Sequence, residues 1–398
     1  MMRGADSGFR AGRGVFGRFN RAFALLIALA FAAPAPAAAQ QGAWDAALGE
    51  FADRLVQDVE ADGVGGVTAG VVVGDSVVWA RGFGWADAER RIPADAATIY
   101  RIGSVAKSFT AVLLMRLVEE GVVALDDPVA RYLPEVDGFV DAQPGSTPIT
   151  FRQLASHTSG LVREPKLEGA AAGPIEAWEH KVLASIPTTG FQAEPGTEYS
   201  YSNIGFGVLG LALSRAADQP FTELIHRHII EPLGMESTTF VITPDLVPRL
   251  AKGYGGNGDA APDTLAPALE HRGRGYKVPN GGVYSTVHDL ARFMAAVGGA
   301  GEPAILSSSS RAELLRVQTP SGEDTRYGLG FSIQDAEAGR FVGHGGSVTG
   351  YNAYLLVHPE SGIGVILLRN HTRGTGLGDY AGDLLKALVH ARAGLASR

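Results

Sequence analysis

Ser104 and Lys107 are the two residues of this sequence whose types and spacing best suit covalent chemistry. They lie three positions apart at the start of a segment with helical periodicity, so their side chains would lie about one turn apart on one face. A serine hydroxyl is a weak nucleophile until a base takes its proton, and a lysine can be that base only when burial or neighbouring positive charge lowers its pKa. The pair therefore predicts an activated nucleophile; the alternative is an N-capping Ser104 with a solvated Lys107.

A second candidate group is Tyr201-Ser202-Asn203, the only Tyr-x-Asn in the chain. It lies between a loop that ends in Pro195-Gly196 and the next helical segment, where a phenol and an amide can face one cleft. The alternative is a structural one, in which Asn203 caps the helix and Tyr201 packs in front of it.

His344-Gly345-Gly346 is the third candidate group, although its pattern alone is weak because His271 also begins a His-x-Gly. Context favours His344, which follows a β-like run and precedes another strand, and two glycines would let a ligand approach an edge strand closely. No histidine belongs to a His-Glu-x-x-His signature and the chain has no cysteine, so no metal site is expected.

The three groups, in this order and at wide spacing, resemble the motif set of penicillin-recognising serine enzymes, the serine β-lactamase and penicillin-binding protein-like family. The class C β-lactamase-like branch is the most similar. The resemblance covers most of residues 45–390, with stretches such as RIGSVAKSFTAVLL, ITFRQLASHTSGL, EYSYSNIGFGVLG, IIEPLGMESTTF and GGVYSTVHDLARFM. It implies a β-lactamase/transpeptidase-like α/β (α+β) fold, an antiparallel sheet flanked by helices with an inserted helical lobe and the active site between them.

Carried over to this sequence, the resemblance implies a role for each motif position. Ser104 would form the acyl-enzyme, and Lys107 and Tyr201 would manage its proton. Asn203 would bind the amide side of the substrate. His344 would take the place of the usual strand lysine or histidine and polarise the site from the sheet edge.

The resemblance also assigns the backbone after His344. The N–H groups of Ser104 and Ser347 would form the oxyanion hole, because Ser347 follows the Gly346 position of the motif. Gly345 is a departure, since relatives that act on penicillins commonly have a hydroxyl residue there that helps bind the substrate carboxylate. A lost hydroxyl and a titratable histidine both weaken carboxylate recognition, so we expect poor β-lactamase activity and favour ester or peptide substrates.

The pattern of apolar residues places strands near both ends of the chain and helices between them. Residues 66–84 form two β-rich runs around a turn, and residues 104–120 have helical periodicity. We therefore expect one antiparallel sheet from about residues 44–100 and 276–398, with a helical lobe from about 101–275.

Residues 1–39 have the features of a secretory signal peptide. Five arginines and one aspartate precede an apolar run over residues 22–33. This run is too short to span a bilayer, and prolines and alanines follow it. Cleavage is expected after Ala39, which would leave residues 40–398 as one β-lactamase-like domain in the periplasm or secreted. An uncleaved anchor is the alternative.

Composition and charge limit the partners. The chain of 398 residues is 45% hydrophobic and 19% charged, as in a soluble globular protein. Its formal charge of −8 becomes about −12 without five arginines and one aspartate of the signal segment. This acidity disfavours nucleic acid or anionic lipid as a partner, and we see no other apolar stretch long enough for stable membrane insertion.

The sequence thus favours a serine hydrolase that acts on small ester, peptide or D-amino-acid peptide substrates through an acyl-enzyme at Ser104, without a cofactor. A D-Ala-D-Ala carboxypeptidase, a class C-type β-lactamase and a non-catalytic penicillin-binding or sensor module remain open, and so does the oligomeric state. Ser76, in Gly-Asp-Ser-Val, resembles the first block of Gly-Asp-Ser-Leu lipases, but the supporting blocks are absent and a hairpin turn explains it.

Overall fold

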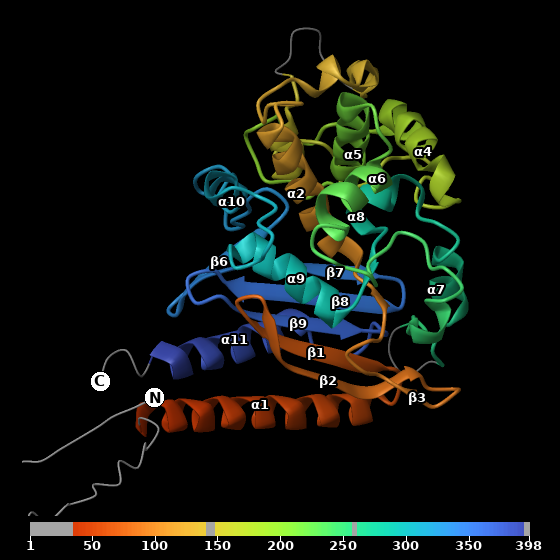
Figure 1. The fold of residues 1–398 in the computed structure, drawn as a ribbon. Coiled ribbons are helices and arrows are strands. Elements are labelled where there is room, and N and C mark those ends of the chain that lie inside the picture. The colour runs from red at the N-terminus through yellow and green to blue at the C-terminus, as the bar shows by residue number, and fades with distance from the viewer. Residues whose placement is uncertain (1–34, 141–147, 257–260, 394–398) are drawn as a thin grey trace, which may run out of the picture.

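The computed structural model describes residues 35–140, 148–256 and 261–393 (Figure 1). Most of the expected signal peptide, residues 1–34, lies outside the described residues. Helix α1, Ala35–Asp62, begins before the expected cleavage site at Ala39. No helix within the described residues is both long and apolar enough to cross a membrane.

Seven of the described strands form one large antiparallel sheet in the order β3-β2-β1-β9-β8-β7-β6. The N-terminal hairpin joins the C-terminal strands through β1 and β9, so both ends of the chain build the same sheet. The strands are β1 (Gly66–Val73), β2 (Ser76–Asp87), β3 (Ile92–Pro93), β6 (Ser332–Ala336), β7 (Gly339–Val348), β8 (Tyr351–His358) and β9 (Ile363–Arg369). β4 (Tyr100–Arg101) and β5 (Tyr284–Ser285) form a separate short pair.

Helices cover both faces of the sheet and fill the space above it in Figure 1. Besides α1 they are α2 (Ala106–Glu119), α3 (Phe151–Ala155), α4 (Trp178–Ser185), α5 (Asn203–Ala217), α6 (Phe221–Ile225), α7 (Leu265–Glu270), α8 (Val278–Gly281), α9 (Val287–Gly298), α10 (Ser308–Leu314) and α11 (Leu377–Ala393). The predicted α/β fold, an antiparallel sheet flanked by helices, is confirmed.

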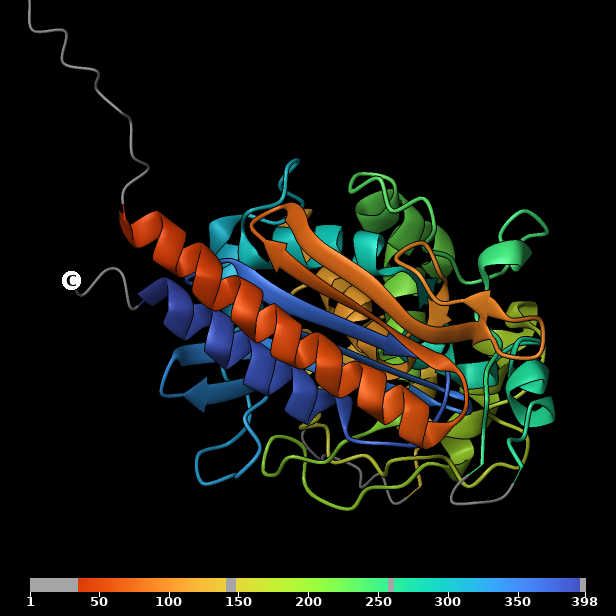
Figure 2. The ribbon, with the colours of Figure 1, turned by 90° about the horizontal axis from the view of Figure 1, so that it is seen from below.

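The lower face of the sheet is covered by the two terminal helices, α1 and α11, which lie side by side and run along the strands (Figure 2). Their apolar side chains, among them Phe51, Leu55 and Leu385, pack on β1 and β9. Every residue of β9 is buried, because α9 packs on the opposite face. This double burial explains why these strands are continuous apolar runs without alternation.

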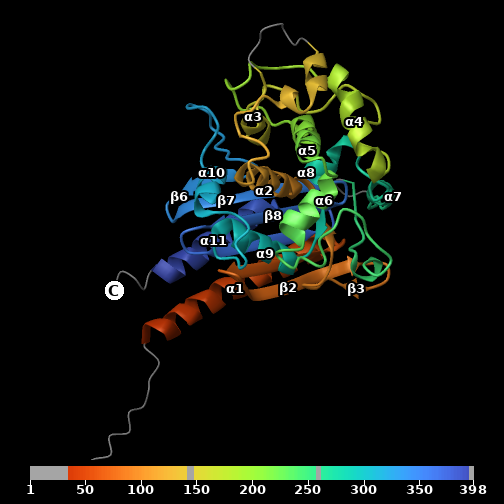
Figure 3. The same ribbon diagram turned by 45° about the horizontal axis from the view of Figure 1, so that its top comes forward.

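Helix α2 lies between the sheet and the upper helices (Figure 3). Nearly all of its side chains from Ala106 to Leu117 are buried, since α5 and α8 pack against it. The rings of Phe109 and Phe293 stack at a centroid distance of 4.0 Å and join α2 to α9. A rigid central helix of this kind holds any side chain in its first turn in a fixed place.

Candidate active site

Ser104 lies in a 3₁₀ turn, Gly103–Val105, immediately before α2. The helix expected over residues 104–120 therefore begins two residues later, at Ala106, and its C-terminal glycine, Gly121, has a φ of 70°. Within the described chain no side chain caps this turn, so Ser104 is not the N-cap that the alternative required. Its partly exposed side chain is available to a ligand.

Lys107 is fully buried, and its amine faces three oxygen atoms. Nζ lies 2.8 Å from Asn203 Oδ1, 3.4 Å from the Asn280 carbonyl oxygen and 3.1 Å from Ser104 Oγ. An uncharged amine has two N–H donors for the two carbonyl-type oxygens, which leaves its lone pair for the serine hydroxyl proton. The geometry is that of a base beside a nucleophile.

The surroundings of Lys107 favour that uncharged form. Burial is the main reason why the pKa of Lys107 lies well below its ordinary value of 10.5. The positive charges of Arg163 and Lys277 lower this pKa further, and the carboxylate of Glu164 opposes them. The solvated Lys107 of the alternative interpretation is therefore wrong.

Tyr201 approaches the same hydroxyl from α5's side of the site. Its phenol forms a hydrogen bond with Ser104, and its ring centroid lies 4.8 Å from Lys107 Nζ and 4.8 Å from the guanidinium carbon of Arg163. Burial raises the pKa of Tyr201 to about 12, against the lowering effect of the Ser104 hydrogen bond. The phenol is therefore protonated at neutral pH and can pass a proton on.

Asn203 is free to act in the site because Ser202 caps α5 instead. The Ser202 hydroxyl accepts from the Gly205 N–H at 2.9 Å, so the alternative in which Asn203 is the cap is wrong. Asn203 Nδ2 donates to Glu164 Oε1 at 2.6 Å. A carboxylate only accepts, so this bond turns Oδ1 of Asn203 toward Lys107. Sequence analysis missed Glu164.

His344 lies within β7 and is almost fully buried. Its Nδ1 lies 2.6 Å from the Gly345 carbonyl oxygen, which only accepts, so Nδ1 carries the proton; Nε2, 2.9 Å from the Tyr327 hydroxyl, then accepts. Burial is the main reason why the pKa of His344 is lowered to about 3. Both nitrogens are thus occupied in a neutral ring, and direct polarisation of a substrate by His344 stays a prediction.

The glycines after His344 accommodate the chain's own backbone. A Cβ on Gly346 would lie 1.9 Å from the Ile102 carbonyl oxygen and 3.1 Å from the Ser104 nitrogen. A Cβ on Gly103 would lie 2.8 Å from the Ser347 nitrogen. Gly346 therefore lets β7 touch the Ser104 turn, and this contact brings the Ser104 and Ser347 N–H groups near each other. The close approach of a ligand to this strand stays a prediction.

Gly345, the position without the expected hydroxyl, lies in β7 opposite Tyr354 of β8. A Cβ there would meet the Tyr354 ring at 3.1 Å. A larger residue at 345 would have to displace that ring.

The sequence matches the family model described as Beta-lactamase over residues 51–389. The chain belongs to this family. Among curated proteins it is similar to the D-alanyl-D-alanine-carboxypeptidase/endopeptidase AmpH of Escherichia coli, with 30% identity covering 85% of this chain and 90% of that one.

Solved structures of the β-lactamase family and its neighbours agree in fold. The octameric penicillin-binding protein homologue from Pyrococcus abyssi is 27% identical, with a TM-score of 0.72 over 88% of this chain and 78% of that chain. A class C β-lactamase is 19% identical, with a TM-score of 0.70 over 85% and 95%. The resemblance inferred from the motifs is confirmed.

His157 is a further residue of the site that sequence analysis did not single out, although it lies within the family-like stretch ITFRQLASHTSGL. Its Nδ1 accepts from the Ser202 N–H at 3.0 Å, and its ring centroid is 4.1 Å from that of Tyr201. It is fully buried, and its φ is 60°. His157 therefore supports the backbone between Tyr201 and Asn203.

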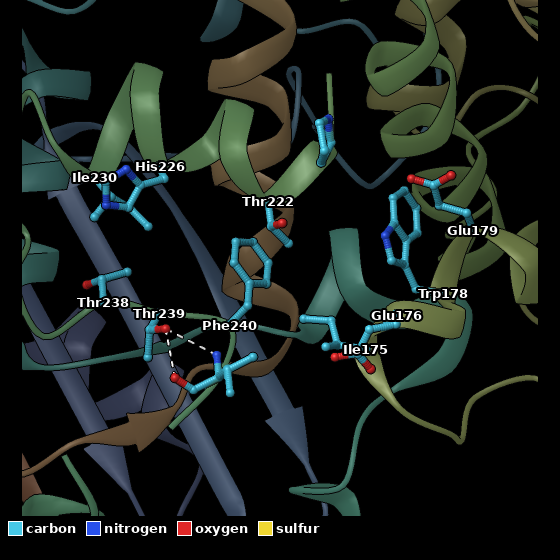
Figure 4. Close-up of a pocket in the computed structure, with 12 residues that line it drawn as sticks. Ile175, Glu176, Trp178, Glu179, Thr222, His226, Ile230, Thr238, Thr239 and Phe240 are labelled. Atoms are coloured by element: carbon cyan, nitrogen blue, oxygen red, sulfur yellow. Dashed lines mark hydrogen bonds between the residues drawn. The ribbon is translucent and has the colours of Figure 1, made fainter. Parts of the chain in front are cut away.

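Two further features concern ligand binding outside the three motifs. No cluster of three or more potential metal ligands exists among the described residues. A pocket of about 480 Å³ lies against Trp178 and Phe240, with Glu176 and Glu179 also lining it (Figure 4). None of its lining residues belongs to the three motifs, so it is separate from the Ser104 site.

Proposed function

We propose that this protein is a serine hydrolase that forms an acyl-enzyme at Ser104 and acts on ester or peptide substrates, including D-amino-acid peptides. The observation that carries the proposal is the buried Lys107 amine, whose two carbonyl-type neighbours leave its lone pair for the Ser104 hydroxyl. The relative named a D-alanyl-D-alanine-carboxypeptidase/endopeptidase supports a peptide substrate.

The proposed reaction begins when Lys107 accepts the Ser104 proton and Oγ attacks the substrate carbonyl carbon. The oxyanion that forms accepts hydrogen bonds from the N–H groups of Ser104 and Ser347. Tyr201 then gives a proton to the leaving nitrogen or oxygen and regains one from Lys107, while the bond to the leaving group breaks. Asn203 holds the Lys107 amine and would bind the substrate's amide. Water then cleaves the acyl-enzyme by the reverse proton path.

Intact-mass analysis after incubation with esters, D-peptides and a penicillin tests the acyl-enzyme. We expect a covalent adduct that Ser104→Ala abolishes, and sustained release of p-nitrophenol from p-nitrophenyl butyrate beyond one equivalent. Ser76→Ala is the matched control, because this exposed serine belongs to the rival Gly-Asp-Ser-Val pattern and should change nothing.

Three results would contradict parts of the proposal. A single burst or no release would favour a non-catalytic binding module, and loss of activity in Ser76→Ala would favour the lipase pattern. Nitrocefin turnover comparable with that of a dedicated β-lactamase would overturn the expected weak β-lactamase activity.

We also propose that the protein is exported to the periplasm or secreted. The arginines and the apolar run of residues 1–39 support this, and sequencing the N-terminus of the mature protein tests it. A mature chain that still begins at residue 1 would contradict cleavage after Ala39.

A further inference from the structure

One wall of the active site is formed by residues 274–281, and Arg274 begins it. The backbone of Arg274 is fixed because a Cβ on Gly273 would lie 1.9 Å from the Gly173 carbonyl oxygen and one on Gly275 would lie 2.0 Å from the Ala170 carbonyl oxygen. Further along the wall, the carbonyl oxygen of Asn280 contacts Lys107. The Arg274 side chain is therefore part of a tightly built segment.

The guanidinium of Arg274 lies beside the turn that carries the nucleophile. From the position that a Cβ on Gly281 would occupy, Arg274 Nη2 is 3.5 Å away and the carbonyl carbon of Gly103 is 4.0 Å away. Gly281 thus lies between the Arg274 guanidinium and the Ser104 turn, and it has no side chain to separate them. A substrate bound at Ser104 would be within reach of this cation.

The charges around Arg274 do not balance. Arg274 forms an ion pair with Glu270, and Arg101 Nη1 lies 3.6 Å from the same carboxylate. Thr349 Oγ1 also donates to Glu270 at 2.7 Å. Burial lowers the pKa of His271, the neighbouring ring, to about 4, so it is neutral at pH 7. Two guanidiniums therefore share one carboxylate, which leaves one buried positive charge.

This cation also has unused hydrogen-bonding capacity. The side chain of Arg101 is almost fully buried and Arg274 is 9% exposed. Among the described residues, the Nε atoms of both arginines are buried without a hydrogen-bond partner. Burial and the charge of Arg101 lower the pKa of Arg274 to about 10, which still leaves it protonated at neutral pH. Such a site stabilises an anion, and a carboxylate matches the planar fork of a guanidinium.

The position of Arg274 decides which part of a substrate it meets. At one end of the site, the His344 ring lies near those of Tyr201 and Tyr327. The other end of β7 leads to Thr349, which bonds Glu270 and thus the Arg274 pair. In the proposed reaction Tyr201 protonates the leaving group, so the leaving group lies at the tyrosine end. The acyl part then extends toward Arg274.

We propose that Arg274 is a specificity-determining residue that binds a carboxylate on the acyl part of the substrate. This rests on the proposed function and narrows its substrates to acyl groups with a second acidic function, such as dicarboxylic acid monoesters or peptides whose acyl-donating residue has an acidic side chain.

Other cations near the site are less suited to this role. Lys277 is paired with Glu164 at 3.1 Å. Arg163 lies over the Tyr201 ring, at the leaving-group end.

The test compares two esters with the same leaving group and chain length, mono-p-nitrophenyl glutarate and p-nitrophenyl pentanoate. We expect Arg274→Gln to lower kcat/KM for the glutarate ester by about tenfold or more, since hydrogen bonds to a charged partner are lost. Turnover of the neutral pentanoate ester should change less than about twofold, because no part of it meets Arg274. Arg274→Lys should retain an intermediate preference, because it keeps the charge but not the fork.

Arg272→Gln is the matched control. It removes the same charge from an exposed position two residues away, and it should leave kcat/KM for both esters unchanged. Gly281→Leu keeps the cation but adds a side chain that points at it, and should selectively slow the glutarate ester even if Arg274→Gln folds poorly. Equal losses for both esters, or the same selectivity in Arg272→Gln, would overturn the proposal. Failure of the wild type to hydrolyse either ester would instead contradict the proposed function.

Discussion

The charged residues nearest to Lys107 mostly repel a proton on its amine. Arg163, Lys277 and Arg274 each lower the pKa of Lys107, and Glu164 raises it. Glu164 also accepts from Asn203 Nδ2 and pairs with Lys277. This carboxylate therefore has two effects on the proposed base: it limits the loss of basicity, and it orients the amide that holds the amine.

Glu164→Gln separates these two effects. The amide removes the negative charge that raises the pKa of Lys107, but its Oε1 can still accept from Asn203. Because the proposed base works in its uncharged form, activity should rise with pH as Lys107 loses its proton. We expect the acid limb of the kcat/KM profile for p-nitrophenyl butyrate to move to lower pH, with less than about a tenfold change at the plateau.

Glu168→Gln is the control for this profile, because it removes the same charge from an exposed position in the same loop. An acid limb that stays in place in Glu164→Gln, or moves to higher pH, would show that Glu164 does not act on the base. A total loss of activity in a folded protein would mean that a carboxylate is itself required.

At the scale of elements, the site depends on the contact between β7 and the Ser104 turn. Residues 102 and 346 are far apart in the sequence, but no side chain fits between their backbones. We expect Gly346→Ala to push the strand away from the turn and to lower kcat by about a hundredfold or more, since displacements of about 1 Å at a reacting centre have effects of this size. Steady-state kinetics with p-nitrophenyl butyrate measures this.

Gly382→Ala is the matched control for that substitution. Gly382 lies in α11, and a Cβ there would meet nothing within 4 Å, so the added methyl should leave activity unchanged. Wild-type kcat in Gly346→Ala would mean that the two backbones can separate without disturbing Ser104, the proposed nucleophile.

The sequence alone predicts the elements of this fold better than their contacts. Local periodicity was enough to predict the helix after Ser104 and the hairpin that starts with β1. The order of the three motifs was enough to predict the family. The role of Gly346 could not be predicted, because it depends on a backbone contact with Ile102 that only the folded chain creates. Glu164 and His157 were missed for the same reason: each acts through a partner about 40 residues away.

The molecule as a whole buries several histidines in their neutral form. Burial is the main cause of each lowered pKa, to about 3 for His344 and His371 and about 4 for His271. They lie in different parts of the fold, and neighbouring charges lower two of these pKa values further: that of Arg369 for His371 and that of Arg101 for His271. Since the unfolded chain exposes all three, their protonation favours unfolding.

Stability should therefore fall on acidification from pH 7.5 to 5.5. Below the unfolded histidine pKa of 6.5, the unfolded chain binds protons that the folded chain takes up only near pH 3 to 4, so each histidine costs up to about 1.4 kcal/mol at pH 5.5. Urea unfolding at the two pH values measures this loss of stability. His371→Gln should reduce the loss by the contribution of one histidine, up to about 1.4 kcal/mol. His180→Gln, at an exposed histidine, is the control and should leave the loss of stability unchanged. Equal stability of the wild type at both pH values would show that these rings are already charged in the folded protein.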